Sequence, residues 1–169
     1  ALSSAASDVY KRQILLYRKE ATFGIKKIQE DNIMAVVAEL IKEENGALSF
    51  GNYELTSKTK FDGFDYKGDK YKVKTFNEIT KLEKNGSFVY ESVPGTVVHG
   101  FKATDTMVEF EVEGTEDSQI TLELEAGQEY VTVIDGNSIG SVKTNLGGKL
   151  NFSVELNPGQ ASQIKIEKL

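Results

Sequence analysis

Residues 149–156 read Lys-Leu-Asn-Phe-Ser-Val-Glu-Leu, with an apolar side chain at every second position. The apolar residues are Leu150, Phe152, Val154 and Leu156. Successive side chains of a strand point to opposite sides, so these four would line one face of an extended segment. The pattern is typical of an antiparallel strand with one face in a core and the other in water.

The same alternation recurs in the segment that precedes this strand. Apolar residues alternate with polar ones at Val108, Phe110, Val112, Ile120, Leu122 and Leu124. Further strands are expected over 130–134, 139–143 and 164–166. Turns are expected at Asp135-Gly136, Gly147-Gly148 and Pro158-Gly159. Short strands at this spacing predict a mainly β protein, with an antiparallel immunoglobulin-like β-sandwich over residues 99–169.

Residues 34–98 are expected to form a smaller β unit that also contains one short helix. Val37, Leu40 and Ile41 would share a helical face over 35–44, and Asn45-Gly46 would end that helix. The remaining elements are strands over 49–55, 58–76, 79–92 and 96–103. Their turns are expected at Lys67-Gly68-Asp69 and Asn85-Gly86.

The first 33 residues differ in character from the rest of the chain. Residues 3–13 read S-S-A-A-S-D-V-Y-K-R-Q and resemble the translation of a transposase adapter used to build sequencing libraries. Met34 is the first methionine, and codons for Gln29-Glu30-Asp31 can contain a ribosome-binding sequence. We expect residues 1–33 to be a non-native leader and the natural protein to begin at Met34. Within the leader, residues 3–13 would come from the adapter and residues 14–33 from an untranslated region.

Without this leader the chain becomes more acidic. The 20 basic and 26 acidic residues fall to 14 and 22, so the formal net charge moves from −6 to −8. An acidic protein with no arginine after residue 18 is a poor partner for nucleic acid or an anionic membrane. No apolar run is long enough to cross a bilayer, and there is no cysteine, so we expect a cytoplasmic location.

The residue types exclude most catalytic and metal chemistry. There is no cysteine nucleophile, and the single histidine, His99, lies in a strand-like stretch without a nucleophile elbow. Asp62, Asp65 and Asp69 do not have the spacing of an EF-hand and are interpreted as turn residues. We expect no catalytic residue, no metal site and no cofactor.

Two side-chain patterns are candidate binding surfaces. One is an acidic stripe on one sheet face, interpreted as a solvated face or, alternatively, as a docking surface for a basic partner. Its members are Glu109, Glu111, Glu113, Glu123 and Glu125. The other is a set of aromatic residues that would bind sugars if exposed and form the core if not. The candidate ligand-binding residues are Tyr53, Tyr66, Tyr71 and Tyr90.

Four segments resemble a group of short bacterial proteins that carry the automatic label endosialidase. The segments are 50–55, 71–83, 90–96 and 144–150. The label implies cleavage of polysialic acid, which requires a group that holds a sugar carboxylate, as arginine does. This chain has no arginine after residue 18, so the resemblance supplies no catalytic residue. We expect a non-catalytic module that acts through protein contacts or self-association, with a carbohydrate-binding accessory module as the alternative.

Overall fold

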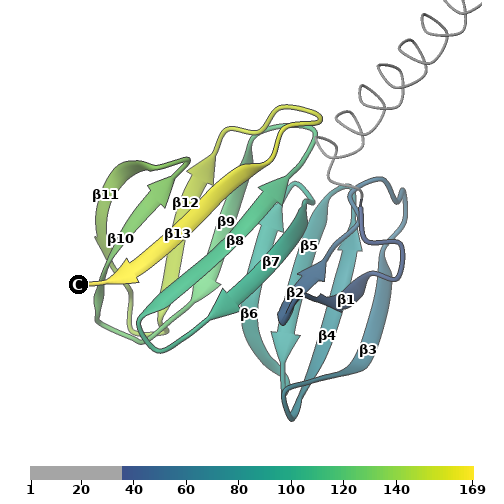
Figure 1. The fold of residues 1–169 in the computed structure, drawn as a ribbon, viewed down its shortest axis with the longest axis horizontal. Helices are drawn as coiled ribbons and strands as arrows, with labels where there is room; N and C mark the ends of the chain where they lie inside the picture. The colour runs from purple at the N-terminus through teal and green to yellow at the C-terminus, as the bar shows by residue number, and fades with distance from the viewer. Residues whose placement is uncertain (1–35) are drawn as a thin grey trace, which may run out of the picture. The chain divides into compact units, whose positions relative to one another are not determined.

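The computed structural model describes residues 36–169 (Figure 1), and these residues form β-strands and no helix. The strands are β1 (Ile41–Glu44), β2 (Ala47–Phe50), β3 (Thr59–Tyr66), β4 (Asp69–Phe76), β5 (Ile79–Lys84), β6 (Ser87–Val93), β7 (Val97–Ala103), β8 (Met107–Glu113), β9 (Ser118–Glu123), β10 (Glu129–Ile134), β11 (Asn137–Lys143), β12 (Lys149–Val154) and β13 (Ser162–Lys168). The predicted mainly β class is confirmed. A helix long and apolar enough to span a membrane is absent from residues 36–169.

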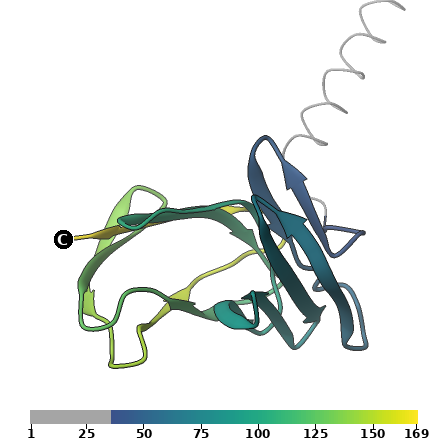
Figure 2. The ribbon, with the colours of Figure 1, turned by 90° about the horizontal axis from the view of Figure 1, so that it is seen from below.

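The strands form two antiparallel sheets that pack in a sandwich-like arrangement (Figures 1 and 2). Sheet A has the order β1-β2-β7-β8-β13-β10-β11, and sheet B has the order β12-β9-β6-β5-β4-β3. Tyr90 of sheet B contacts two rings of sheet A edge-on, with centroids 5.3 Å from Phe50 and 5.7 Å from Phe110. The two sheets therefore share one aromatic core.

The alternation read from the sequence decides which side chains enter this core. Leu150, Phe152 and Val154 of β12 are buried, and Leu156 just beyond the strand is buried with them. Asn151 and Ser153, which alternate with them, are exposed. Burial of each large apolar side chain stabilises the fold by roughly 1.5–3 kcal/mol relative to exposure.

The predicted boundary between residues 98 and 99 falls inside β7. Sheet A joins β1 and β2 to the strands that follow residue 98, and sheet B joins β3–β6 to β9 and β12. The ladder between β6 and β9 places Tyr90 opposite Leu122. Residues 36–169 belong to one compact unit. The smaller β unit and the C-terminal sandwich expected from the sequence therefore share both sheets.

Four hairpins turn on two residues that both have positive φ. The turns are Asn45-Gly46, Lys67-Gly68, Asn85-Gly86 and Asp135-Gly136, with φ between 49° and 52° at the first residue and between 74° and 83° at the glycine. Two positive φ angles define the type I′ turn, whose twist matches that of the strands it joins. The turns predicted around residues 67–69, 85–86 and 135–136 are confirmed.

The helix predicted over 35–44 is wrong for residues 36–44, and Ala35 lies outside the described residues, as does the predicted leader over 1–33. Ile41–Glu44 is β1, which pairs with β2 around the Asn45-Gly46 turn. Leu40 has a φ of 70°, which a right-handed helix cannot contain. Val37, Leu40 and Ile41 are all buried, because a turn closed by the Leu40 N–H and the Val37 carbonyl folds this segment onto the core.

Candidate functional site

Two adjoining chambers open between the sheets, at the end where the β1–β2, β3–β4, β5–β6 and β7–β8 turns lie. The larger has a volume of about 740 Å³ and the smaller of about 520 Å³. They share the lining residues Val89, Phe101, Ala103, Thr104, Glu123 and Leu124, so they form one continuous hollow, which we call the inter-sheet cleft. Volumes of this order are typical of small-molecule sites.

Aromatic and aliphatic side chains from both sheets line the larger chamber. Sheet A contributes Leu48 and Phe101, and sheet B contributes Tyr66, Tyr71 and Phe88. The rings of Tyr66 and Tyr71 meet edge-on with centroids 5.9 Å apart. The Tyr66 hydroxyl donates to the Gly46 carbonyl at 2.7 Å and so ties sheet B to the β1–β2 turn. Burial is the main cause of the raised pKa of Tyr71.

The structure brings together two of the four predicted ligand-binding residues. Tyr66 and Tyr71 line the cleft, whereas Tyr53 and Tyr90 lie elsewhere. Tyr90 is fully buried, and its hydroxyl lies 2.8 Å from the Thr96 hydroxyl. Loss of hydration raises the pKa of Tyr90 to about 12. Its ring serves the core and does not face the cleft.

Tyr53 follows β2 and is half-buried beside a carboxylate. Its hydroxyl donates to Oε1 of Glu113 at 3.4 Å. Partial burial, followed by the negative charge of Glu113, raises the pKa of Tyr53 to about 12. Glu113 itself is 1% exposed. This contact joins the segment after β2 to the end of β8.

The charged groups around the larger chamber divide into paired and unpaired ones. Lys84 Nζ lies 3.1 Å from Asp69 Oδ2, and Asn85 donates to the other oxygen of Asp69, Oδ1, at 2.8 Å. These two partners lower the pKa of Asp69, the Asn85 hydrogen bond most. Glu123 pairs with Lys149 at 2.6 Å. Lys67 also lines this chamber and is in no ion pair with a carboxylate of residues 36–169, whereas Lys102 stands opposite Glu109 on the outer face of sheet A.

The sequence did not identify Phe88, Phe101, Lys67 or Lys102 as parts of one site. Phe88 is on β6, Lys67 is in the β3–β4 turn, and Phe101 and Lys102 are neighbours on β7, so the stacking of the sheets brings three separate elements together. One local signal was present: Lys67 directly follows Tyr66, an aromatic residue that lines the cleft. The Nζ atom of Lys67 lies 5.0 Å from the centre of the Tyr66 ring.

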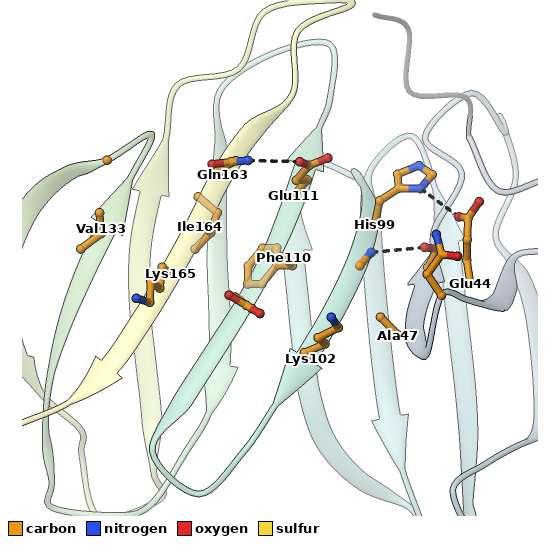
Figure 3. A pocket seen from close by; sticks show the side chains of 15 residues that line it. Glu44, Ala47, His99, Lys102, Phe110, Glu111, Val133, Gln163, Ile164 and Lys165 are labelled. Carbon is orange, nitrogen blue, oxygen red and sulfur yellow. Dashed lines mark hydrogen bonds and ion pairs between the residues drawn. The ribbon is translucent and has the colours of Figure 1, made fainter. Parts of the chain in front are cut away.

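A third hollow of about 540 Å³ lies on the outer face of sheet A (Figure 3). Glu109 of β8 stands opposite Lys102 on β7 and Lys165 on β13. One row further along β8, Glu111 accepts a hydrogen bond of 3.3 Å from the Gln163 amide. Acidic and basic side chains alternate across the strands, so this face is close to neutral.

A β-bulge places His99 and Lys102 on this same face, although they are three residues apart. The ladder shifts between His99 and Lys102, where Gly100 has a φ of 66° and its N–H donates to the Ser49 hydroxyl at 3.3 Å. A bulge adds one residue and so reverses the alternation beyond it. Figure 3 shows the ring of His99 directed toward Glu44, with Nδ1 4.0 Å from Oε2.

The expected acidic stripe on one sheet face is wrong. β8 lies in sheet A and β9 in sheet B, so Glu109 and Glu111 are on a different sheet from Glu123. Glu113 is buried, and Glu125 follows β9 and pairs with Lys168 at 2.5 Å. Alternation within two consecutive strands does not reveal that they belong to different sheets.

The aspartates of the β3–β4 hairpin form separate ion pairs. Asp65 lies 2.6 Å from Lys70, and Asp69 is held by Lys84 as described above. Asp62 lies 3.9 Å from Lys72. Within residues 36–169, no group of three His, Asp or Glu side chains is arranged to hold a metal ion.

Strand β11 is a second kind of candidate site, because all seven of its residues are exposed. It lies at the edge of sheet A, where it pairs only with β10. Its apolar residues Ile139 and Val142 are 54% and 48% exposed. Such a strand presents main-chain groups and apolar side chains to any chain that pairs with it.

No protein-family model, no curated protein and no solved structure matches this chain.

Proposed function

We propose that the protein is a non-catalytic β module that associates with a second copy of itself by pairing two β11 strands. The exposure of every residue of β11 carries this proposal. An exposed edge strand is a template for strand addition, in which main-chain hydrogen bonds supply the affinity.

The direction of the main-chain groups identifies the free positions of β11. The Asp135 N–H donates to Gln163, and the Leu169 N–H donates to Glu129, so odd-numbered residues of β10 point toward β13. Even-numbered residues of β10 therefore point toward β11. Tyr130 stands opposite Val142, so Val142 pairs with β10 while the neighbouring Ser141 and Lys143 point to the free edge.

The charges of β11 favour a second copy over open-ended growth. Lys143 is the only charged residue of β11 and lies at its end. Antiparallel pairing about a two-fold axis places the Lys143 side chains at opposite ends of the new ladder. Because each copy uses its β11 edge, the pair is closed, as isologous dimers are.

Sedimentation velocity of the full chain over a concentration series tests this proposal. We expect a monomer–dimer equilibrium that Val142→Lys weakens at least about tenfold, or 1.4 kcal/mol. Ser141→Pro removes an outward N–H without removing a main-chain bond to β10, although it also removes the exposed bond from the Ser141 hydroxyl to Glu129, and it should have the same effect. Phe61→Lys is the matched control, because Phe61 is a 42% exposed residue on the edge strand β3 of the other sheet.

Two results would contradict the dimer proposal. One is a monomer at all concentrations. The other is a dimer that Val142→Lys and Phe61→Lys weaken equally. Thermal unfolding of each variant separates loss of the interface from loss of the fold.

A carbohydrate-binding accessory module is the second candidate function. It is supported by the position of Tyr66 and Tyr71 in the cleft, with Asp69 and Asn85 at the same chamber. The two rings meet at 66° and are each under 10% exposed, so they offer edges and not a flat stacking face. Saturable binding on a glycan array, lost in Tyr71→Ala, would support this function; a blank array from folded protein would remove it.

We also propose an immunoglobulin-like connection for the last five strands. In an immunoglobulin sandwich, strands B and E pair in one sheet while C and F lie in the other. Here β9 pairs with β12 in sheet B and β10 pairs with β13 in sheet A, which supports this assignment. β8 then occupies the place beside β13 that strand G takes in that fold.

A further inference from the structure

We propose that Asn45 is a site of spontaneous deamidation that loosens the β1–β2 hairpin, whereas the fold protects the chemically equivalent Asn85. The chain contains two Asn-Gly pairs, at residues 45–46 and 85–86. Asparagine is a thermolabile residue, and a following glycine has no side chain to hinder attack on the amide. The site is independent of the proposed dimer, since neither pair lies in β11.

The reaction needs only water and groups of the chain itself. The main-chain nitrogen of Gly46 attacks Cγ of Asn45, so an N–Cγ bond forms, the Cγ–Nδ2 bond breaks, and ammonia leaves with the proton of the attacking nitrogen. The product is a succinimide ring. Water then adds to one of the two ring carbonyls and opens the ring, which gives either aspartate or isoaspartate. Neither step involves oxidation or reduction.

The two Asn-Gly pairs share the features that local sequence controls. Both form two-residue turns, with a φ of 52° at Asn45 and 49° at Asn85. Both pairs are exposed, and nothing lies within 4 Å of a Cβ placed on either glycine. Water and space are therefore equally available at both turns, and a difference in rate must come from the contacts that hold each turn.

The contacts of the two asparagine side chains differ. Oδ1 of Asn85 accepts a hydrogen bond of 2.9 Å from the Lys70 N–H, and Nδ2 donates to Oδ1 of Asp69 at 2.8 Å. These bonds hold both polar atoms of the amide and oppose the rotation that ring closure requires. Within residues 36–169, the side chain of Asn45 forms no hydrogen bond.

The place of each hairpin in its sheet explains this difference. The partners of Asn85 come from β4, which lies beside β5, the first strand of that hairpin. The β10–β11 turn follows the same rule, because Oδ1 of Asp135 accepts a hydrogen bond of 2.8 Å from the N–H of Gln163 on β13, beside β10. β1 is the edge of sheet A, so no strand lies beyond it in that sheet to hold Asn45.

The β1–β2 turn also opens more readily than the other hairpin turns. β1 has four residues and pairs only with β2, and short edge elements open locally at a low free-energy cost. The Tyr66 hydroxyl donates to the Gly46 carbonyl at 2.7 Å. That bond holds the peptide after Gly46, whereas the reacting nitrogen belongs to the peptide before it.

Both products of the reaction weaken the hairpin. Each adds a carboxylate to a segment that already carries Glu43 and Glu44. Isoaspartate also adds one carbon atom to the main chain of a two-residue turn, which disturbs the pairing of Glu44 with Ala47. We therefore expect faster hydrogen exchange over Ile41–Glu44 in the modified protein.

Peptide mapping by mass spectrometry tests the proposal on the full chain, incubated in mildly alkaline buffer. We expect the amide of Asn45 to become an acid at least about tenfold faster than that of Asn85, because two hydrogen bonds protect Asn85. Incubation in concentrated urea is the reference. Both pairs are then released from the fold and should react at similar rates.

Two variants test the cause of the protection. Asp69→Ala removes the acceptor of the Asn85 amide, and it should speed the reaction at Asn85 at least about threefold while Asn45 in the same molecule keeps its rate. Asp65→Ala is the matched control. It removes a carboxylate of the same β3–β4 hairpin that is paired with the Lys70 side chain and leaves the bonds of Asn85 in place.

Any of four results would overturn the proposal. They are equal rates at the two asparagines in the folded chain, the same ratio of rates in urea as in buffer, equal effects of Asp69→Ala and Asp65→Ala at Asn85, and unchanged hydrogen exchange of β1 after modification. Because Asp69 also pairs with Lys84, the unfolding midpoint of Asp69→Ala is measured beside its rates. A faster reaction at both asparagines in that variant would indicate general loosening and would also reject the protective role of the bond.

Discussion

Gly95 lies where the chain passes from sheet B to sheet A, and its backbone is packed too closely for any side chain. A Cβ atom on Gly95 would stand 2.0 Å from the Phe76 carbonyl oxygen. The Gly95 N–H donates to the Asn77 carbonyl at 2.9 Å, so the segment cannot move away without losing that bond. A proline followed by a glycine, as in Val93-Pro94-Gly95, is typical of a break between strands, but only the fold shows what Gly95 touches.

We predict that Gly95→Ala lowers the free energy of unfolding by at least about 2 kcal/mol, because the new methyl group overlaps a backbone atom. Gly147→Ala is the matched control: its Cβ would meet only the end of the Asn145 side chain, at 3.3 Å. The control should change stability by no more than about 0.5 kcal/mol. Urea denaturation measures both, and equal effects would contradict the prediction.

Buried hydroxyl groups explain why Tyr90 is a structural residue. Oγ1 of Thr96 lies 2.8 Å from the Tyr90 hydroxyl and 2.7 Å from that of Ser92. The Thr80 hydroxyl donates to the Thr96 carbonyl at 2.8 Å. All four residues are fully buried. From its sequence position, a tyrosine in a strand could belong either to a ligand site or to the core. The buried hydroxyl groups around Tyr90 show that it belongs to the core.

At the scale of elements, the two-residue turns define the hairpins. Asn85-Gly86 joins β5 to β6 with positive φ at both residues, and nothing lies within 4 Å of a Cβ placed on Gly86. The cost of a side chain at this position is therefore conformational and not steric. Asparagine tolerates the left-handed region better than alanine does.

We predict that Gly86→Ala destabilises the protein by about 1–2 kcal/mol, the cost of a left-handed residue. Gly86→Asn should cost clearly less, since the environment is open and only the backbone preference differs. Thermal unfolding of the two variants measures the difference. A larger loss in the asparagine variant would show that contacts of the turn, and not its φ angle, decide its stability.

The β1–β2 hairpin shows how an element can be misread from its turn. Asn45-Gly46 is compatible with the end of a helix as well as with a type I′ turn, because both require positive φ. The short apolar spacing of Val37, Leu40 and Ile41 favoured the helix. The pairing of Ile41 with Phe50 at the edge of sheet A is a long-range contact that local spacing does not contain.

At the scale of the whole molecule, both sheets combine strands from each side of residue 98, so the core is shared. Leu82 of β5 and Ile166 of β13 are both 0% exposed members of this core. A protein built this way should unfold as one cooperative unit.

We predict a single unfolding transition for the chain, monitored by circular dichroism and by hydrogen exchange. Leu82→Ala and Ile166→Ala should each lower the same midpoint, at a cost of about 2–5 kcal/mol. If Leu82→Ala instead separated an early transition of residues 34–98 from a later one of 99–169, the two-unit organisation predicted from the sequence would be correct.

The sequence alone determined the β class, the buried faces of strands such as β12, and three of the type I′ turns. These features depend on contacts between near neighbours: alternation assigns side chains to faces, and asparagine or glycine permits positive φ. The tertiary structure alone decided which strands pair, that β8 and β9 belong to different sheets, and that Tyr66 and Phe101 line one chamber. Alternation of apolar and polar residues indicates that a strand has an inner face, but it does not indicate which strand pairs with it or packs on that face. That choice depends on packing between residues far apart in the chain, and a single bulge at Gly100 is enough to move Lys102 onto the face of His99.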